Sequence, residues 1–202
     1  MSESRGKTIR NLVNSKINRI LKSQNEPMVK SELAELRKGI GGIPGDRPEL
    51  WWSVFEDFPE QYMSDNDTPS KEEWSFYIAL TLFAMHQQGH DVEKEPMHVE
   101  GIPFGQAVRR LAPPGDEDAL ARVRRRFNIV ATSSDISELS YHLRGIIQLM
   151  RSAGIPLDYG LLADNLYHYQ FPDRVSRVRL KWGQDFYRRN ANEESNKKKA
   201  QQ

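Results

Sequence analysis

Residues 70–89 read SKEEWSFYIALTLFAMHQQG and are the most informative stretch of the chain. Ser70 and Glu73 have the spacing of a capping box, in which the first residue caps a helix and the fourth bonds back to the backbone of the first. The segment that follows is apolar on nearly every side of a helix, which is typical of a helix surrounded by others. Gly89 is a helix stop. We therefore predict a buried central helix over about 74–88.

Helical spacing of apolar residues continues on both sides of this segment. We predict further helices over the first twenty-odd residues and over the ranges 29–38, 104–111, 116–131, 134–152, 158–170 and 173–189. The four glycines and two prolines of GIGGIPGDRP predict a loop over 39–48. The apolar cluster after it, which includes Trp51 and Trp52, is predicted to anchor the core. No segment alternates in the manner of a strand, so we predict no sheet.

The polar segment 89–103 is the best candidate for a boundary between subdomains. We therefore expect an all-α protein of about eight or nine helices, arranged as two small helical-bundle subdomains over 1–95 and 96–190. The last residues, 191–202, are polar and rich in lysine, which predicts a disordered tail.

The composition excludes several classes of function. The chain has 202 residues, of which 38% are hydrophobic and 28% charged, and it contains no cysteine. Disulfides, thiol catalysis and cysteine-ligated metal sites are therefore excluded, and the absence of cysteine fits a reducing cytoplasm. No apolar run approaches the roughly 18 residues of a membrane span, and the first residues have no apolar signal region. We expect a cytoplasmic protein without a membrane partner.

The net charge of +1 conceals a strong segregation along the chain. Residues 51–100 carry 2 basic and 11 acidic side chains, whereas residues 101–190 carry 14 basic and 9 acidic ones. Thirteen of these 14 basic residues are arginines, and only Lys181 is a lysine. Because the planar guanidinium group binds phosphate through two hydrogen bonds at once, this bias favours oxyanion binding. The ordinary alternative is surface arginines that pair with Asp and Glu one helical turn away.

Motifs of catalysis and metal binding are missing. The chain has no GxSxG elbow and no GxxxxGK[ST] phosphate loop. His86, His90 and His98 could gather around a metal ion, but no HExxH pattern or other acidic ligand position accompanies them. We predict no catalytic residue, no metal site and no cofactor. A metal-dependent enzyme that uses His86 and His98 stays open as an alternative.

Basic residues recur on the polar sides of the later predicted helices. In 116–131, three arginines share one face away from the apolar stripe, and in 173–189 basic residues recur every three or four positions. Like charges one turn apart cost about 0.2–0.5 kcal/mol each, a cost that a bound polyanion would remove. The cations placed on such faces or at helix ends are Arg37, Lys38, Arg109, Arg110, Arg122, Arg125, Arg126, Arg174, Arg177 and Lys181. For Arg109 and Arg110, capping of a helix C-terminus is the alternative.

Several short motifs, in this order, resemble those of the CasB family, the small subunit of the type I-E CRISPR surveillance complex Cascade. The resemblance covers roughly residues 31–190. The motifs are Leu36-Arg37-Lys38-Gly39, Pro48 with Trp51, Ala84-Met85-His86-Gln87-Gln88, Met97-His98, Gly101-Ile102-Pro103-Phe104-Gly105, Arg124-Arg125-Arg126-Phe127, His142-Leu143-Arg144, and Trp182 with Phe186-Tyr187.

The resemblance implies an all-α protein without catalytic activity or cofactor. Its implied partners are the backbone and large subunits of Cascade, guide RNA, target DNA including the displaced single strand, and a second copy packed head to tail. Its implied role is to stabilise the R-loop through contacts with the phosphate backbone, because base pairing reads the sequence. The basic residues that match positions of the family are Arg37, Lys38, Arg125, Arg126 and Arg144.

One segment departs from the family pattern. Between Phe127 and Ser140 some relatives carry extra arginines, whereas this chain has Asn128, Thr132 and the run 133–135. Contacts with a strand at this helix junction are therefore in doubt. A different class of function also stays open: a helical adaptor whose arginines dock on acidic proteins, including residues 51–100 of a second copy, without binding nucleic acid.

Overall fold

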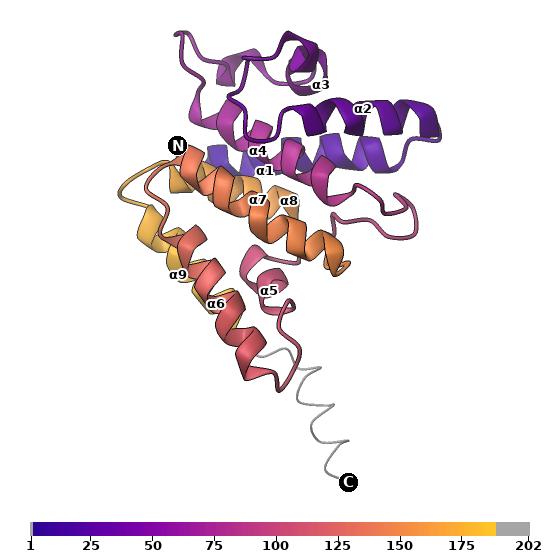
Figure 1. The fold of residues 1–202 in the computed structure, drawn as a ribbon. Coiled ribbons are helices and arrows are strands. Elements are labelled where there is room, and N and C mark those ends of the chain that lie inside the picture. The colour runs from indigo at the N-terminus through magenta and orange to yellow at the C-terminus, as the bar shows by residue number, and fades with distance from the viewer. Residues whose placement is uncertain (1, 189–202) are drawn as a thin grey trace.

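The computed structural model describes residues 2–188 and is all-α, as predicted (Figure 1). Within the described residues there is no strand, only an isolated parallel bridge between His98 and Leu157. No helix there is long and apolar enough to cross a membrane. The α-helices are α1 Ser2–Leu21, α2 Glu26–Lys38, α3 Trp51–Phe55, α4 Lys71–His86, α5 Phe104–Arg109, α6 Glu117–Ala131, α7 Ile136–Ser152, α8 Tyr159–Tyr169 and α9 Val175–Tyr187, with 3₁₀ turns η1 Pro48–Leu50 and η2 Glu60–Tyr62.

Helix α4 lies at the centre of the molecule, where α1, α2, α7 and α8 pack against it (Figure 1). Its capping box is present: the Glu73 amide donates to Ser70 Oγ at 3.0 Å, and the Ser70 amide donates to Glu73 Oε2 at 2.6 Å. Every residue from Ser75 to His86 is buried. The predicted central helix is therefore confirmed, and its all-round apolar surface is explained by neighbours on several sides.

The segment around α3 differs from its prediction. Leu50, Val54 and Phe58 are buried, but the side chains of Trp51 and Trp52 are 52% and 47% exposed. The three buried residues are spaced four apart, so one face of this short segment meets the core and the two tryptophans lie outside that face. The apolar cluster therefore anchors the core through its aliphatic residues and Phe58, and the expectation for Trp51 and Trp52 was wrong.

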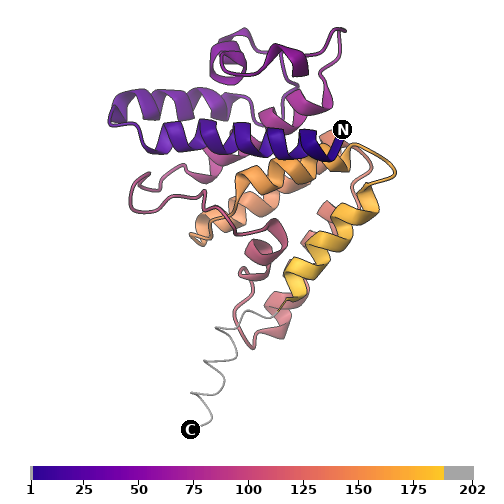
Figure 2. The ribbon, with the colours of Figure 1, turned by 180° about the vertical axis from the view of Figure 1, so that it is seen from behind.

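Helices from both halves of the chain contribute to one hydrophobic core. Ile9 of α1, Phe83 of α4 and Leu162 of α8 are each 0% exposed, and α8 packs against both α1 and α4. Helices α5, α6 and α9 lie together at the end of the molecule away from α2 and α3 (Figures 1 and 2). The division at residue 95 stays a prediction, and the predicted tail 191–202 lies outside the described residues.

Candidate nucleic-acid interface

Helix α6 buries one side and exposes arginines on the other. Asp116 caps it, because its carboxylate accepts the amide of Ala119 at 2.7 Å, and the buried residues of the helix include Val123 and Phe127. The exposed arginines are Arg122, Arg124, Arg125 and Arg126. Among the residues that the structure describes, none of these four forms an ion pair. Their charges are therefore free to attract a polyanion.

Helix α7 adds residues beside the exposed arginines of α6. A groove of about 380 Å³ is lined by Arg126 and Ile129 of α6 and by Tyr141, His142 and Arg144 of α7, among others. Arg144 is exposed, and the Tyr141 side chain is 71% exposed. Arginines bind phosphates and an exposed aromatic ring can stack on a base, so the groove combines the two contacts that single-stranded nucleic acids receive. We call the set Arg122, Arg125, Arg126, Tyr141 and Arg144 the α6–α7 surface.

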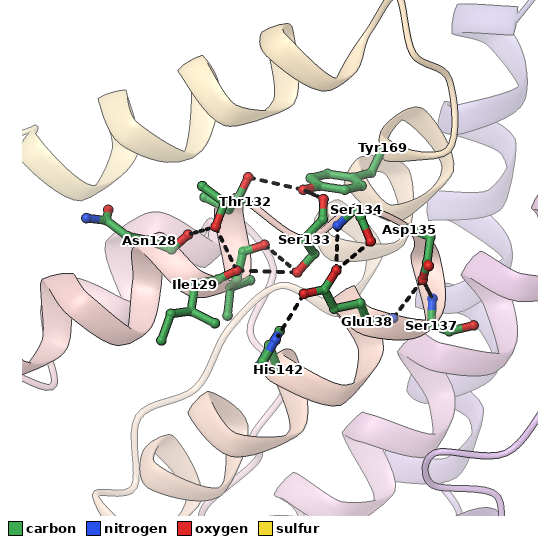
Figure 3. A network of polar contacts seen from close by, with 12 residues as sticks. Asn128, Ile129, Thr132, Ser133, Ser134, Asp135, Ser137, Glu138, His142 and Tyr169 are labelled. Atoms are coloured by element: carbon green, nitrogen blue, oxygen red, sulfur yellow. Dashed lines mark hydrogen bonds and ion pairs between the residues drawn. The ribbon is translucent and has the colours of Figure 1, made fainter.

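A local polar network fixes the junction between α6 and α7 (Figure 3). The Asp135 carboxylate accepts the amides of Ser137 and Glu138 at 2.9 and 2.8 Å. The Glu138 carboxylate accepts the Ser134 amide at 2.7 Å and the Ser134 hydroxyl at 2.6 Å, and these bonds lower the pKa of Glu138. It also lies 3.5 Å from His142 Nε2. The segment 133–138 therefore caps and orients α7.

The other side of the junction is closed by residues from α8 and α9. The Tyr169 hydroxyl donates to the Ser133 carbonyl at 2.8 Å (Figure 3). Arg179 Nη2 lies 3.2 Å from the Tyr169 hydroxyl oxygen and 3.4 Å from the Ser133 carbonyl oxygen. These contacts tie the segment between α6 and α7 to α8 and α9.

The predicted basic residues of the α9 region do not extend the α6–α7 surface. Arg174, Arg177 and Lys181 line a second pocket, of about 340 Å³, together with Lys7 and Arg10 of α1. Figure 1 looks onto α6 and α7, whereas α1, α8 and α9 face the viewer in Figure 2, turned by 180°. The predicted basic residues of α6 and α7 therefore lie on a different side of the molecule from those of the α9 region (Figures 1 and 2).

The remaining predicted cations lie at helix ends. Arg109 Nη1 donates to the carbonyl of Ala112 at 3.0 Å, three residues beyond the end of α5, so this contact is not a cap of the helix's own last carbonyls. Arg110 is exposed. Lys38 Nζ lies 2.7 Å from Glu35 Oε1, and burial lowers the pKa of Arg37. None of these four residues lines either basic region.

The loop that follows Arg37 and Lys38 nevertheless reaches the α6–α7 surface. Gly41 and Gly42 border a pocket of about 100 Å³ that Tyr141 and Arg144 also line. This pocket continues the groove between α6 and α7, because Tyr141 and Arg144 line both. The glycine loop therefore contributes one rim of the candidate interface.

The histidines have structural partners. His86 Nδ1 lies 2.9 Å from the Tyr159 hydroxyl, and burial lowers the pKa of His86 to about 3. His98 Nδ1 accepts the backbone amide of Tyr159 at 3.1 Å, and His90 Nε2 lies 2.9 Å from the carbonyl oxygen of Arg151. Within residues 2–188 no three potential metal ligands come together. The structure therefore adds nothing in favour of the metal-dependent alternative.

Sequence reasoning missed two parts of the basic regions. Tyr141 was overlooked, although its place in the sequence, beside the apolar stripe of α7, could have indicated an exposed aromatic residue. Lys7 and Arg10 were overlooked because their role depends on the packing of α1 against α8, which no local pattern in the sequence specifies.

Comparisons with known proteins agree with the motifs. A family model described as CRISPR-associated protein Cse2 matches residues 32–187. CasB from Thermobifida fusca is 35% identical, with a TM-score of 0.74 over 89% of this chain and 98% of that chain. CasB from Thermus thermophilus is 19% identical, with a TM-score of 0.61 over 87% and 97% of the two chains.

A chain of a solved CRISPR RNA-guided surveillance complex shares the fold at 20% identity, with a TM-score of 0.67 over 89% of this chain and 93% of that chain. No curated protein matches the chain significantly. The family model covers most of the sequence, and the T. fusca protein is aligned along nearly its whole length. The chain therefore belongs to the Cse2 (CasB) family of CRISPR-associated proteins.

Proposed function

We propose that this protein is a non-catalytic small subunit of a type I-E CRISPR Cascade complex in the cytoplasm. It holds nucleic acid on the α6–α7 surface and stabilises the R-loop through contacts with the guide–target duplex and the displaced strand. Family membership supports the assignment to a CRISPR system, and a chain of similar fold belongs to a surveillance complex. The observation that carries the proposal is the set of unpaired arginines beside an exposed tyrosine.

The chemistry of the surface fits recognition of a backbone without recognition of a base sequence. Guanidinium groups bind phosphate oxygens, and a tyrosine ring stacks on any base because every base has an aromatic face. Base pairing with the guide reads the sequence, so the protein has only to bind phosphates and unpaired bases. Such binding weakens with salt, with a log–log slope of about −0.7 for each phosphate neutralised on a single strand.

The electrostatic part is tested with a triple variant, Arg122→Gln, Arg125→Gln and Arg126→Gln. A matched control removes three exposed cations elsewhere: Lys22→Gln, Lys30→Gln and Arg47→Gln. Binding to labelled single-stranded DNA is measured by fluorescence anisotropy over a salt series. We expect the α6 variant to make the salt slope shallower by about 2, or about 0.7 for each lost contact, and the control to leave it nearly unchanged. Equal losses in both variants would reduce the effect to net charge and overturn the site.

The same variants are then tested inside the assembled complex, because neighbouring subunits add contacts that raise the effective affinity. The chain is co-expressed with the other subunits and the guide RNA of its own system. We expect it to co-purify with them, and the α6 variant to assemble normally but to form R-loops with a lower yield on target DNA. A chain that does not co-purify, or an α6 variant with unchanged R-loop yield, would contradict the proposal.

A second copy of the chain is the proposed neighbour, packed head to tail. Residues 51–100 carry 11 acidic and 2 basic side chains, so they complement the basic residues of 101–190 in another copy. Trp51 and Trp52 lie in this acidic range and are about half exposed, so they add apolar contact area to it. We expect analytical ultracentrifugation to detect a dimer that weakens with salt. A monomer at every concentration and salt level would remove the second copy from the proposal.

A further inference from the structure

The pocket between α1, α8 and α9 brings together cations from distant parts of the chain. Its lining includes Lys7, Arg10, Arg174, Arg177 and Lys181, and its volume is about 340 Å³. Asp164 is the one carboxylate in the same lining. Arg10, Arg174 and Lys181 also contact carboxylates outside this lining. The lining itself presents more positive than negative groups, which favours an anion over a cation in the pocket.

Several of these cations are held in place from behind. Arg10 Nη2 lies 3.7 Å from the fully buried Asp158, and Asp158 also accepts the amides of Gly101 at 2.9 Å and Leu161 at 2.8 Å. Lys181 Nζ lies 2.8 Å from Asp185 Oδ1, whose side chain is 3% exposed. Neither carboxylate lines this pocket, so both contact these cations from outside it.

Arg174 is positioned by an aromatic ring and a histidine. Its guanidinium carbon lies 4.3 Å from the ring centroid of Phe171, and its Nη1 lies 3.3 Å from His168 Nδ1. Stacking on an aromatic face and bonding to a ring nitrogen fix the plane of the guanidinium without cancelling its charge. Its carboxylate contact, Asp173 at 3.6 Å, has a side chain that is 76% exposed.

The approach of α1 to α8 closes one wall of the pocket. A Cβ atom at Gly6 would overlap the Asp164 carboxylate and lie 2.7 Å from His168 Nε2. Glycine at this position therefore lets the first turns of α1, with Lys7 and Arg10, lie directly against α8. Burial raises the pKa of the Asp164 carboxyl, although His168, Arg10 and Lys7 oppose the shift.

We propose that this pocket binds a phosphate group. The ligand chemistry is a phosphate oxyanion, carried by a polynucleotide or free in solution, held by guanidinium and ammonium groups from α1 and α9. The site is separate from the α6–α7 surface and includes residues that precede the segment matched by the family model, which begins at residue 32. It does not depend on the proposed function.

The test uses the full chain and a double variant, Lys7→Gln with Arg174→Gln, which keeps the contacts of the buried Asp158 and Asp185 intact. Lys22→Gln with Lys30→Gln is the matched control. Inorganic phosphate and a single-stranded oligonucleotide are titrated separately, by NMR chemical shifts and by anisotropy, and thermal melting checks folding. The single variant Lys7→Glu keeps every ion pair of the pocket and serves if the double variant is unstable.

We expect the double variant to weaken phosphate binding by about tenfold or more, with no change in the control. If the pocket takes phosphate only as part of a polynucleotide, inorganic phosphate leaves the spectra of the parent protein unchanged. The double variant then has a salt slope for the oligonucleotide that is shallower by about 1.4, because two phosphate contacts are lost. Either result supports the pocket. Binding of both probes that is unchanged in the double variant and in Lys7→Glu overturns it, whatever the α6 triple variant does.

Discussion

Helices α6 and α9 are both rich in arginine, but their cations have different surroundings. In the described part of the chain, Arg122, Arg125 and Arg126 of α6 form no ion pair. On α9, Lys181 pairs with Asp185 at 2.8 Å, and Arg179 contacts the Tyr169 hydroxyl at 3.2 Å. Both helices show the same sequence pattern, with basic residues opposite apolar ones. The partner of Lys181 lies one turn along the same helix, whereas the partner of Arg179 lies on α8. The surroundings of a cation therefore depend on local pairs as well as on tertiary packing.

The largest expected effect is on the packing that holds α9. A Cβ atom at Gly105 of α5 would overlap the carbonyl of Trp182 and lie 2.9 Å from the amide nitrogen of Phe186. Because backbone cannot yield as a side-chain tip does, Gly105→Ala should destabilise the protein by about 1–3 kcal/mol. For a chain of this size that corresponds to about 2–4 °C in Tm for each kcal/mol, measured by calorimetry.

The matched control for that change lies on the α6–α7 side. Gly145 of α7 has no atom within 4 Å of an added Cβ, so Gly145→Ala should raise the stability by up to about 1 kcal/mol through helix propensity. Opposite signs at the two glycines would show that α9 is tightly packed where α7 is open. A Gly105→Ala protein as stable as the parent would contradict the close approach of α5 and α9.

Next in size is the contribution of base stacking. Tyr141→Ala should lower the affinity for single-stranded DNA by about 1–3 kcal/mol, and Tyr141→Phe should lower it little, because the ring provides the contact. Neither change should alter the salt slope. Tyr187 of α9 is the control, since its side chain is 67% exposed, close to the 71% of Tyr141. If Tyr187→Ala weakens binding as much as Tyr141→Ala, the two helices do not differ as we infer.

A smaller effect separates structural arginines from binding arginines. Arg179→Gln removes contacts with Ser133 and Tyr169 and should destabilise the protein by about 1 kcal/mol. Arg122→Gln removes no hydrogen bond or ion pair among the described residues and should change the stability by less than about 0.5 kcal/mol. It should also make the salt slope of DNA binding shallower by about 0.7. Urea unfolding and anisotropy measure the two effects. Identical profiles for both variants would show that α6 and α9 are equivalent.

Much of the architecture was predictable because it is local. The capping box of Ser70 and Glu73, the burial of α4 on all sides, and the arginine face of α6 follow from spacing along one helix. The exposure of Trp51 and Trp52 was not predictable in this way. A dense apolar cluster indicates that some of its residues reach the core, but the direction of a one-turn helix is set by the elements that it packs against.

The candidate site shows the same limit. Helical-face reasoning placed Arg122 and Arg174 on the polar sides of two different helices but could not say how those sides lie relative to each other, whereas in the fold they belong to different basic regions. Lys7 entered no prediction, because the pocket exists only when α1 lies against α8 and α9. The family resemblance carried the functional assignment through motifs spread over the chain, and such motifs hold no information about contacts specific to α1.

The smallest expected effect tests whether pairing alone distinguishes the two helices. Asp185→Asn keeps the shape of the side chain but removes the charge that holds Lys181 at 2.8 Å. With that ion pair gone, no carboxylate competes with a phosphate for Lys181, and the salt dependence of oligonucleotide binding should become steeper by at most about 0.7. Glu35→Gln, which releases Lys38 outside both basic regions, is the control and should leave the salt slope of oligonucleotide binding nearly unchanged. An Asp185→Asn protein with the parental salt slope would mean that the position of Lys181, and not its partner, decides whether phosphate can reach it. The contrast between α6 and α9 would then rest on geometry alone.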